Sequence, residues 1–498
     1  MNLRLMFIYT LLLTLASYEV VGQEDSLTYK LSTGSVYSVN DNLPLYSHSN
    51  IGGIFDYDFN GPFAIASVKG TQWKNLNFGG EFIIANQNQT ILLREIYVDY
   101  RLGPFSFFAG KRDISEQQRK PTDPGNFGIS YNARPIPKIG ISFPDYWAIP
   151  HTKGLVAIKG TFFHGWFEED RFIDSPVLHE KSAYLKLGND KIYLESGINH
   201  FAMWGGVNTL TGENLYEGFS DFYRVIKGGG RDGVTTAGEQ NAIGNHLGYW
   251  NYQFNYEFEN FKLEVYNNAL FEDAGGSKIF NNDNLITGFN IKVKSNKEIR
   301  IKTFSFQYMN ILDQSGPGLP DPTESVPTKA ENFGFNFGGR DDTYNNYLYR
   351  DGWTHFNRTI GSPLFIDRAL SQFYFGIIPD YEVAIVNNRI KSFHLGISGQ
   401  YKELDFRLLS TFTQNYGTYA GLYEGRFEWN GIQTDPNFEY TFLEPLKQAY
   451  FLLEVGSKPF KNQNIDATMS IAYDRGQITD NLGVSLSLAY NDVFERNQ

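Results

Sequence analysis

Cysteine is absent from this chain of 498 residues. Disulfides, thiolate metal sites and a lipid-anchored N-terminal cysteine are therefore all excluded. Beyond the N-terminus, no apolar run approaches the roughly 18 residues that a transmembrane helix needs. Basic residues are also outnumbered, with 43 Lys and Arg against 55 Asp and Glu, which gives a net charge of −12. This acidic balance predicts no nucleic-acid partner.

The N-terminal segment differs from the rest of the chain. Residues 1–22 carry a lone cation at Arg4, an apolar core over 5–16, and a small residue, Gly22, where a signal peptidase would cut. The core is too short to cross about 30 Å of hydrocarbon. The pattern therefore predicts a signal peptide at 1–22, followed by one mature domain over 23–498.

Aromatic residues and glycine are abundant, with 42 Phe, 32 Tyr and 49 Gly. Many segments alternate apolar and polar residues with a period of two, which is typical of strands with one apolar face. Five such apolar faces are Trp250, Tyr252, Phe254, Tyr256 and Phe258; Phe261, Leu263 and Val265; Phe289, Ile291 and Val293; Leu395, Ile397 and Tyr401; and Val484, Leu486, Leu488 and Tyr490.

Two all-β architectures fit this alternation. A soluble two-sheet sandwich would need several domains, because single cores stop growing near about 250–300 residues, and no suitable linker is found. A single closed antiparallel transmembrane β-barrel satisfies every backbone group and uses the aromatic excess as interfacial girdles. At roughly 10 residues per strand plus connections, the chain accommodates about 16–18 strands. We therefore predict an all-β barrel in the cell outer membrane, surrounded by outer-membrane lipid.

Three long polar inserts interrupt the strand pattern, at 121–150, 207–245 and 310–372. Barrels of this kind place short turns on the periplasmic side and long loops outside. We expect the inserts to form the outer surface or to plug the lumen.

No catalytic or metal-binding pattern is present. None of the eight histidines lies in an H-E-x-x-H arrangement, and no G-x-S-x-G elbow accompanies the serines near them. The sequence predicts no enzyme, no metal site and no cofactor.

Candidate binding residues cluster in the inserts. Arg350, Trp353 and Arg358 lie in the third insert, and Tyr223 and Arg224 lie in the second. Arg clamps carboxylates and aromatic rings stack on the apolar faces of sugars. We expect these residues to line a glycan-binding patch on the outer side, where the two inserts meet.

Two alternatives remain for individual candidates. Arg350 can instead pair with Asp351 inside a plugged lumen and only fix the loop. Trp204, which we expect to be exposed at the end of a strand that stops on Gly205-Gly206, is either an interfacial anchor or a sugar-stacking residue.

A family resemblance covers most of the mature chain. The chain resembles the Wzi-type capsule assembly family in collinear motifs that include Leu93-Arg94-Glu95, Val98-Asp99-Tyr100-Arg101-Leu102-Gly103-Pro104-Phe105, Pro135-Ile136-Pro137-Lys138-Ile139, His164-Gly165-Trp166-Phe167, Leu178-His179-Glu180-Lys181-Ser182, Trp204-Gly205-Gly206, Gly244-Asn245-His246-Leu247-Gly248, Tyr349-Arg350-Asp351-Gly352-Trp353, Arg358-Thr359-Ile360-Gly361-Ser362-Pro363 and Asn415-Tyr416-Gly417-Thr418-Tyr419. The resemblance implies an outer-membrane barrel of about eighteen strands that acts as a lectin for capsular or other surface polysaccharide. Family members from other lineages carry a periplasmic helical bundle, but no comparable helical segment is found between Gln23 and Asn60. We expect that bundle to be absent or reduced.

The functional prediction is a non-enzymatic protein that attaches or organises surface polysaccharide. The alternative is a general porin or a small-solute transporter of the outer membrane. The two differ in whether the lumen is plugged or open.

Overall fold

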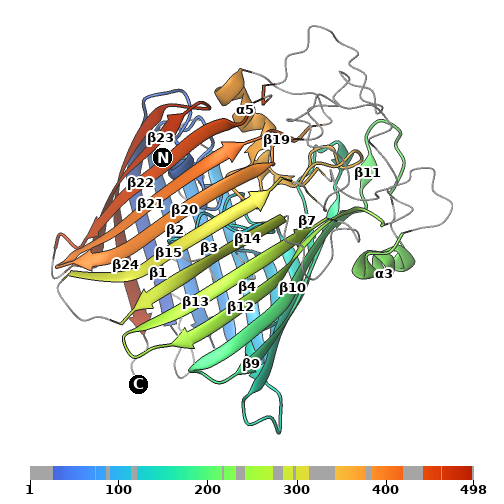
Figure 1. The fold of residues 1–498 in the computed structure, drawn as a ribbon, viewed down its shortest axis with the longest axis horizontal. Helices are drawn as coiled ribbons and strands as arrows, with labels where there is room; N and C mark the ends of the chain where they lie inside the picture. The colour runs from blue at the N-terminus through green and yellow to red at the C-terminus, as the bar shows by residue number, and fades with distance from the viewer. Residues whose placement is uncertain are drawn as a thin grey trace, which may run out of the picture.

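The computed structural model describes residues 26–72, 75–85, 90–113, 121–215, 218–230, 242–272, 284–294, 299–312, 314, 342–376, 383–418, 441–442, 444–460 and 463–495. Within them the chain forms one closed antiparallel barrel of eighteen strands (Figure 1). This confirms the predicted all-β barrel, at the upper end of the expected strand number. The predicted signal peptide at 1–22 lies outside the described residues.

Barrel strands pair with their neighbours in chain order, and the ring closes where the first strand pairs with the last. These strands are β1 (Ser26–Ser38), β2 (Gly61–Gln72), β3 (Leu76–Ala85), β4 (Thr90–Leu102), β5 (Phe105–Lys111), β6 (Lys138–Ala148), β7 (Val156–Trp166), β9 (Val177–Gly188), β10 (Ile192–Trp204), β12 (Asn245–Glu257), β13 (Phe261–Phe271), β14 (Asn284–Val293), β15 (Ile299–Ile311), β20 (Ile390–Tyr401), β21 (Leu404–Asn415), β22 (Leu446–Ser457), β23 (Ile465–Gly476) and β24 (Asn481–Glu495).

The loops contain short strand pairs and helices. The pairs are β8 (Ile173–Asp174) with β11 (Val207–Asn208), β16 (Thr354–His355) with β17 (Arg358–Thr359), and β18 (Ile366–Asp367) with β19 (Ile385–Asn387). The helices are α2 (Leu45–His48), α3 (Phe219–Lys227) and α5 (Arg368–Phe375). Among the described residues, no helix has the length and apolar character needed to span a membrane.

Apolar and polar residues of the strands face opposite sides of the wall. On β24, Val484, Leu486 and Leu488 point outward, and Leu486 is 56% exposed. On β12, Asn251 and Asn255 point into the lumen and are buried. The predicted period-two alternation is therefore confirmed, and the apolar residues form an outer surface of the kind that barrels present to lipid.

Connections differ at the two ends of the barrel. One end has short turns, such as Lys402-Glu403 between β20 and β21, whereas the other end carries the connections 39–60, 112–137, 205–244 and 312–389. We call these the turn end and the loop end.

The bounds predicted for two inserts were wrong. The insert at 121–150 contains strand β6, whose register is irregular between Phe143 and Trp147, around Pro144. The predicted start of the third insert, 310, falls two residues too early, because β15 ends at Ile311 and the connection runs over 312–389.

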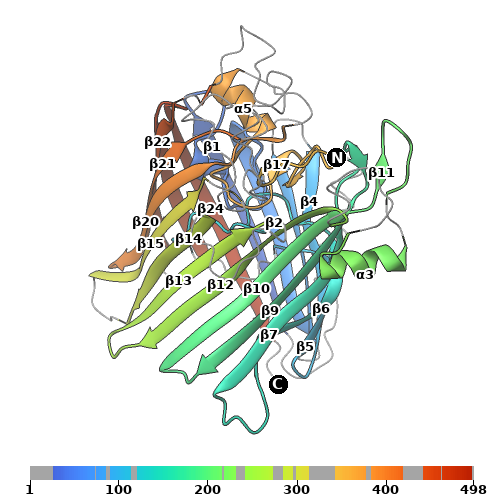
Figure 2. The same ribbon diagram turned by 45° about the vertical axis from the view of Figure 1, so that its right-hand side comes forward.

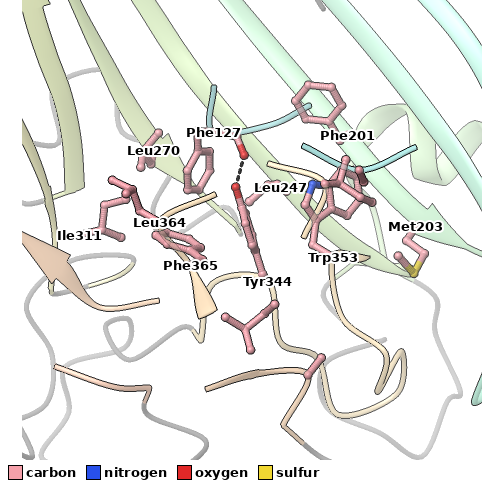
Figure 3. Packing of buried hydrophobic residues seen from close by; sticks show 14 of the residues in the cluster. Phe127, Phe201, Met203, Leu247, Leu270, Ile311, Tyr344, Trp353, Leu364 and Phe365 are labelled. Atoms are coloured by element: carbon pink, nitrogen blue, oxygen red, sulfur yellow. Dashed lines mark hydrogen bonds between the residues drawn. The ribbon is translucent and has the colours of Figure 1, made fainter. Parts of the chain in front are cut away.

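Three loop segments enter the loop-end half of the lumen, and we call them the plug: 39–60, 121–137, and a third segment described over 342–376 and 383–389. Their apolar side chains pack against inward-facing residues of the wall. Figure 3 shows Trp353 beside Phe201 of β10, and Phe127 close to Tyr344 and Phe365. The largest hydrophobic core of the described residues thus lies inside the barrel, where a porin would have water.

Hydrogen bonds join the plug segments to one another. The Tyr344 hydroxyl donates to the carbonyl oxygen of Phe127 (Figure 3), and Trp353 Nε1 donates to the carbonyl oxygen of Gly128 at 2.7 Å. His394 of β20 lies with Nε2 2.7 Å from the carbonyl oxygen of Thr122. The second segment is therefore attached both to the third segment and to the wall.

Candidate functional site

The outer face of the plug carries aromatic side chains with arginine beside them. The Arg350 guanidinium lies 4.4 Å from the centroid of the Phe172 ring. Arg350 Nε donates to the carbonyl oxygen of Tyr347 at 3.2 Å, and Tyr347 is 50% exposed. The Phe172 amide donates to Asp351 Oδ2 at 2.6 Å. We call Phe172, Tyr347 and Arg350 the Arg350 patch.

The connection 205–244 adjoins this patch. Thr209 Oγ1 donates to the carbonyl oxygen of Phe172 at 2.8 Å. The Tyr349 hydroxyl lies 3.4 Å from the carbonyl oxygen of Gly205. These contacts involve Gly205 and Thr209, whereas the predicted patch drew on Tyr223 and Arg224.

A second exposed ring lies at the tip of the β16–β17 hairpin. Phe356 and Asn357 form its two-residue turn, with φ angles of +50° and +58°. A positive φ on a bulky residue costs about 1–3 kcal/mol. The Phe356 ring is 50% exposed, and the Arg134 guanidinium lies 4.9 Å from its centroid. We call Phe356 and Arg134 the Phe356 patch.

Buried ionic contacts fix the loops that carry the two patches. Arg171 donates to Glu168 at 2.8 Å and to the carbonyl oxygens of Gly352 and Thr354 at 3.0 and 2.9 Å. Burial opposes ionisation of Glu168, but the hydrogen bond from His355 and the charge of Arg171 outweigh it and lower its pKa to about 2. Burial also lowers the pKa of His355, so a neutral imidazole donates through Nδ1 to the Glu168 carboxylate. The loop after β7 and the β16 strand are thus fixed side by side.

This arrangement suits sugar binding better than catalysis. A half-exposed aromatic ring can stack on the apolar face of a sugar, and a neighbouring guanidinium can bind hydroxyl or carboxylate oxygens. No three His, Asp or Glu side chains are grouped to hold a metal ion in the part of the chain that the structure describes.

Trp353 and Arg358 do not lie on this surface. The prediction that they line an exposed patch is therefore wrong. Trp353 is 1% exposed in the plug core. Arg358 is 5% exposed and donates to the carbonyl oxygens of His48 and Phe55 at 2.8 and 2.6 Å. Its guanidinium lies 4.3 Å from the centroid of the Tyr57 ring. Both residues hold plug segments together because the third segment folds inward.

Trp204, Tyr223 and Arg224 lie together on the outer wall of the barrel. Trp204 was expected to be exposed, but it is 6% exposed because helix α3 packs against it. The Phe222 ring of α3 stacks on it, with centroids 5.6 Å apart. Tyr223 is 51% exposed on α3, and Arg224 donates to the carbonyl oxygen of Gly230 at 2.8 Å. A glycan-binding role for these three residues stays a prediction.

Sequence reasoning missed Phe172, Tyr347, Phe356 and Arg134. Phe172 lies in a loop outside the three inserts. The Phe356-Asn357 turn lacks the glycine that usually marks a two-residue hairpin. The one available signal was the motif around Arg350, which contains a part of the patch.

Fold and site together define a plugged barrel of the transmembrane type, whose own loops occupy the lumen and present arginine and aromatic side chains at the loop end. The family model described as capsule assembly protein Wzi matches residues 15–297, more than half of the chain. The chain therefore belongs to the Wzi capsule assembly family, which confirms the resemblance seen in the sequence.

Several solved structures are similar to the chain. Wzi of Escherichia coli, an outer-membrane protein involved in group 1 capsule assembly and described as a carbohydrate-binding β-barrel, is 11% identical with a TM-score of 0.55, over 92% of this chain and 83% of that chain. OccAB4 of Acinetobacter baumannii is 9% identical with a TM-score of 0.47, over 95% and 99%. OccK5 (OpdH) of Pseudomonas aeruginosa is 9% identical with a TM-score of 0.46, over 95% and 98%. A sequence comparison with curated proteins found no match.

Proposed function

We propose that this protein lies in the outer membrane with its loop end outside the cell, and that it holds surface polysaccharide there without altering it chemically. The observation that carries the proposal is the outer face of the plug. There the guanidinium groups of Arg134 and Arg350 lie against the rings of Phe356 and Phe172, and Phe356 and Tyr347 are half-exposed. Membership of a capsule assembly family supports it, and the E. coli neighbour is described as carbohydrate-binding.

The charge of the protein gives these arginines a specific role. At a net charge of −12, the whole chain repels an acidic polymer. Retention of such a polymer then depends on local cations, and a guanidinium binds a carboxylate through two parallel hydrogen bonds. The rings add stacking contacts that do not depend on charge, so both patches are suited to repeated weak contacts along a chain of sugars.

The first experiment tests the Arg350 patch. In a strain that lacks the native gene, a Tyr347→Ala, Arg350→Ala variant is expected to release polymer into the medium, because it loses a ring and a cation from the surface. Leu210→Ala is the matched control, since Leu210 is 74% exposed at the loop end and lies outside both patches. Unchanged cell-bound polymer in the double variant, with normal heat-modifiability on gels, would contradict the assignment of this surface.

The second candidate function is a porin or a small-solute transporter, and one observation favours it. Below the plug, polar residues such as Lys159, Tyr193 and Gln253 line a cavity of about 330 Å³. A second cavity of about 1190 Å³ adjoins it, since both are lined by Tyr46 and Arg407. Displacement of the plug would convert this space into a channel.

Conductance in planar bilayers separates the two functions. The polysaccharide-holding protein is expected to show no stable open steps, because the plug occupies the lumen. Deletion of the gene should leave polymer synthesis intact and move polymer from the cell to the medium. Large, long-lived open steps together with unchanged polymer retention would favour the porin.

A further inference from the structure

Helix α3 lies against the outside of the barrel wall, beside β7, β9 and β10 (Figures 1 and 2). Its Phe222 ring stacks on Trp204, the last residue of β10, and its Val225 is fully buried in a cluster with Ala202. One face of the helix is therefore packed on the wall.

The wall beneath α3 is polar where it should meet lipid. Lys181 of β9 donates to the carbonyl oxygen of Ile226, and the His179 ring lies 5.5 Å from the Phe222 ring. An outward-facing Lys is unfavourable in the hydrocarbon and less so toward the interface. The outward-facing polar residues of this region are His164, His179, Lys181, His200 and His246. By covering part of this surface, α3 keeps these groups from hydrocarbon.

Another face of α3 exposes two aromatic rings. Phe219 is 85% exposed and Tyr223 is 51% exposed. Together with Lys227 they are spaced four residues apart, so they form one stripe along the helix. The Lys227 ammonium lies 4.3 Å from the centroid of the Tyr223 ring. The stripe thus joins two exposed rings to a cation.

On the turn-end side of α3, the outer wall of the barrel is apolar. The strands below α3 expose Leu185 and Leu194, and Trp166 is 42% exposed at the loop-end terminus of β7. In an outer-membrane barrel, aromatic residues at this level lie at the lipid headgroups, with the aliphatic residues in the hydrocarbon below.

We propose that α3 is an interfacial helix that binds outer-leaflet lipid. Phe219 and Tyr223 enter the boundary between headgroups and acyl chains, and Lys227 binds a lipid phosphate. The proposal rests on the outer-membrane location in the proposed function, and it is independent of the polysaccharide role.

The absence of native cysteine permits single-site spin labelling of the full chain. Phe219→Cys, Leu194→Cys and Leu210→Cys variants would be labelled and reconstituted in vesicles of phosphatidylcholine and phosphatidylglycerol. Oxygen concentrates in lipid and a nickel chelate stays in water, so their collision rates report the surroundings of each label. The label at residue 219 is expected to match the lipid-facing label at 194 in favouring oxygen, and the label at 210 is expected to favour nickel.

The controls separate two kinds of failure. A water-exposed label at 194 would overturn the membrane location itself. A lipid-exposed label at 194 with a water-exposed label at 219 would overturn only the role of α3.

The phosphate contact has its own test. Replacing phosphatidylcholine by phosphatidylglycerol is expected to shift the label at 219 toward oxygen, and Lys227→Gln should abolish that shift. Lys153→Gln is the matched control, because Lys153 is an exposed lysine at the turn end. An equal shift with and without Lys227 would show that Lys227 does not bind lipid phosphate.

Discussion

Replacing Arg358 by Ala is expected to open the plug and leave the barrel intact. The guanidinium is buried and donates to the carbonyl oxygens of His48 and Phe55. Hydrogen bonds to a charged group contribute about 1.5–3 kcal/mol each, and a desolvated cation–π contact such as that with Tyr57 contributes about 2 kcal/mol. Because these contributions overlap, we expect the closed plug to lose about 5 kcal/mol. That loss is of the order of the whole stability of a small domain.

Single-channel conductance measures this opening directly. Arg358→Ala should show open steps that the unmodified protein lacks, while its band on gels still shifts on heating as a closed barrel does. Arg350→Ala is the matched control, because an exposed cation–π contact contributes only about 0.5–1 kcal/mol. The reasoning would be refuted by an Arg358→Ala protein that stays as closed and as protease-resistant as the unmodified one. Arg358→Lys should be intermediate, since an ammonium lacks the fork that reaches two carbonyls.

Three further perturbations address the plug. A Cβ at Gly361 would overlap the Tyr344 hydroxyl. Gly361→Ala should therefore destabilise the plug by about 1–3 kcal/mol and speed proteolysis at the loop end. An unchanged rate of cleavage would contradict this packing. Phe356→Asn places a residue that tolerates positive φ in the turn. It should stabilise the plug by about 1 kcal/mol and weaken polymer retention. The melting temperature should therefore rise while the amount of cell-bound polymer falls, and any other combination would contradict the prediction. Acidification should loosen the plug, because burial lowers the pKa of His48 and His355 and the open state binds more protons. The closed plug is then fully stable above about pH 6.5 and loses up to about 1.4 kcal/mol per histidine per pH unit below it; conductance that does not change with pH would rule this out.

The wall could be predicted from the sequence because lipid outside and polar side chains inside impose a strict alternation. Residues 482–490 of β24 and 250–256 of β12 show it without interruption. Strand β6 was missed because Pro144 and Asp145 break the alternation at its irregular register. Closure of the barrel follows from the same physics, since an open edge in hydrocarbon leaves backbone groups unsatisfied.

The site could be predicted only in part. Arg350 was found because it lies among aromatic residues in its own insert, but its stacking partner Phe172 comes from another loop. Their segments meet through a hydrogen bond between residues 179 positions apart. Arg358 has the same local composition as an exposed loop arginine, and only the folding of the plug buries it. Local sequence carries no signal for such long-range loop contacts.

The pairing of β1 with β24 makes the barrel depend on the far end of its own chain. Ser26 lies opposite Glu495, so the ring cannot close until the last strand has been made and delivered. A chain cut short by the 15 residues of β24 would have two unpaired edges, at β1 and at β23. Such edges recruit strands from other chains and are costly in hydrocarbon. A truncated copy is therefore expected to aggregate before insertion, so fragments of this protein would not accumulate as leaky pores.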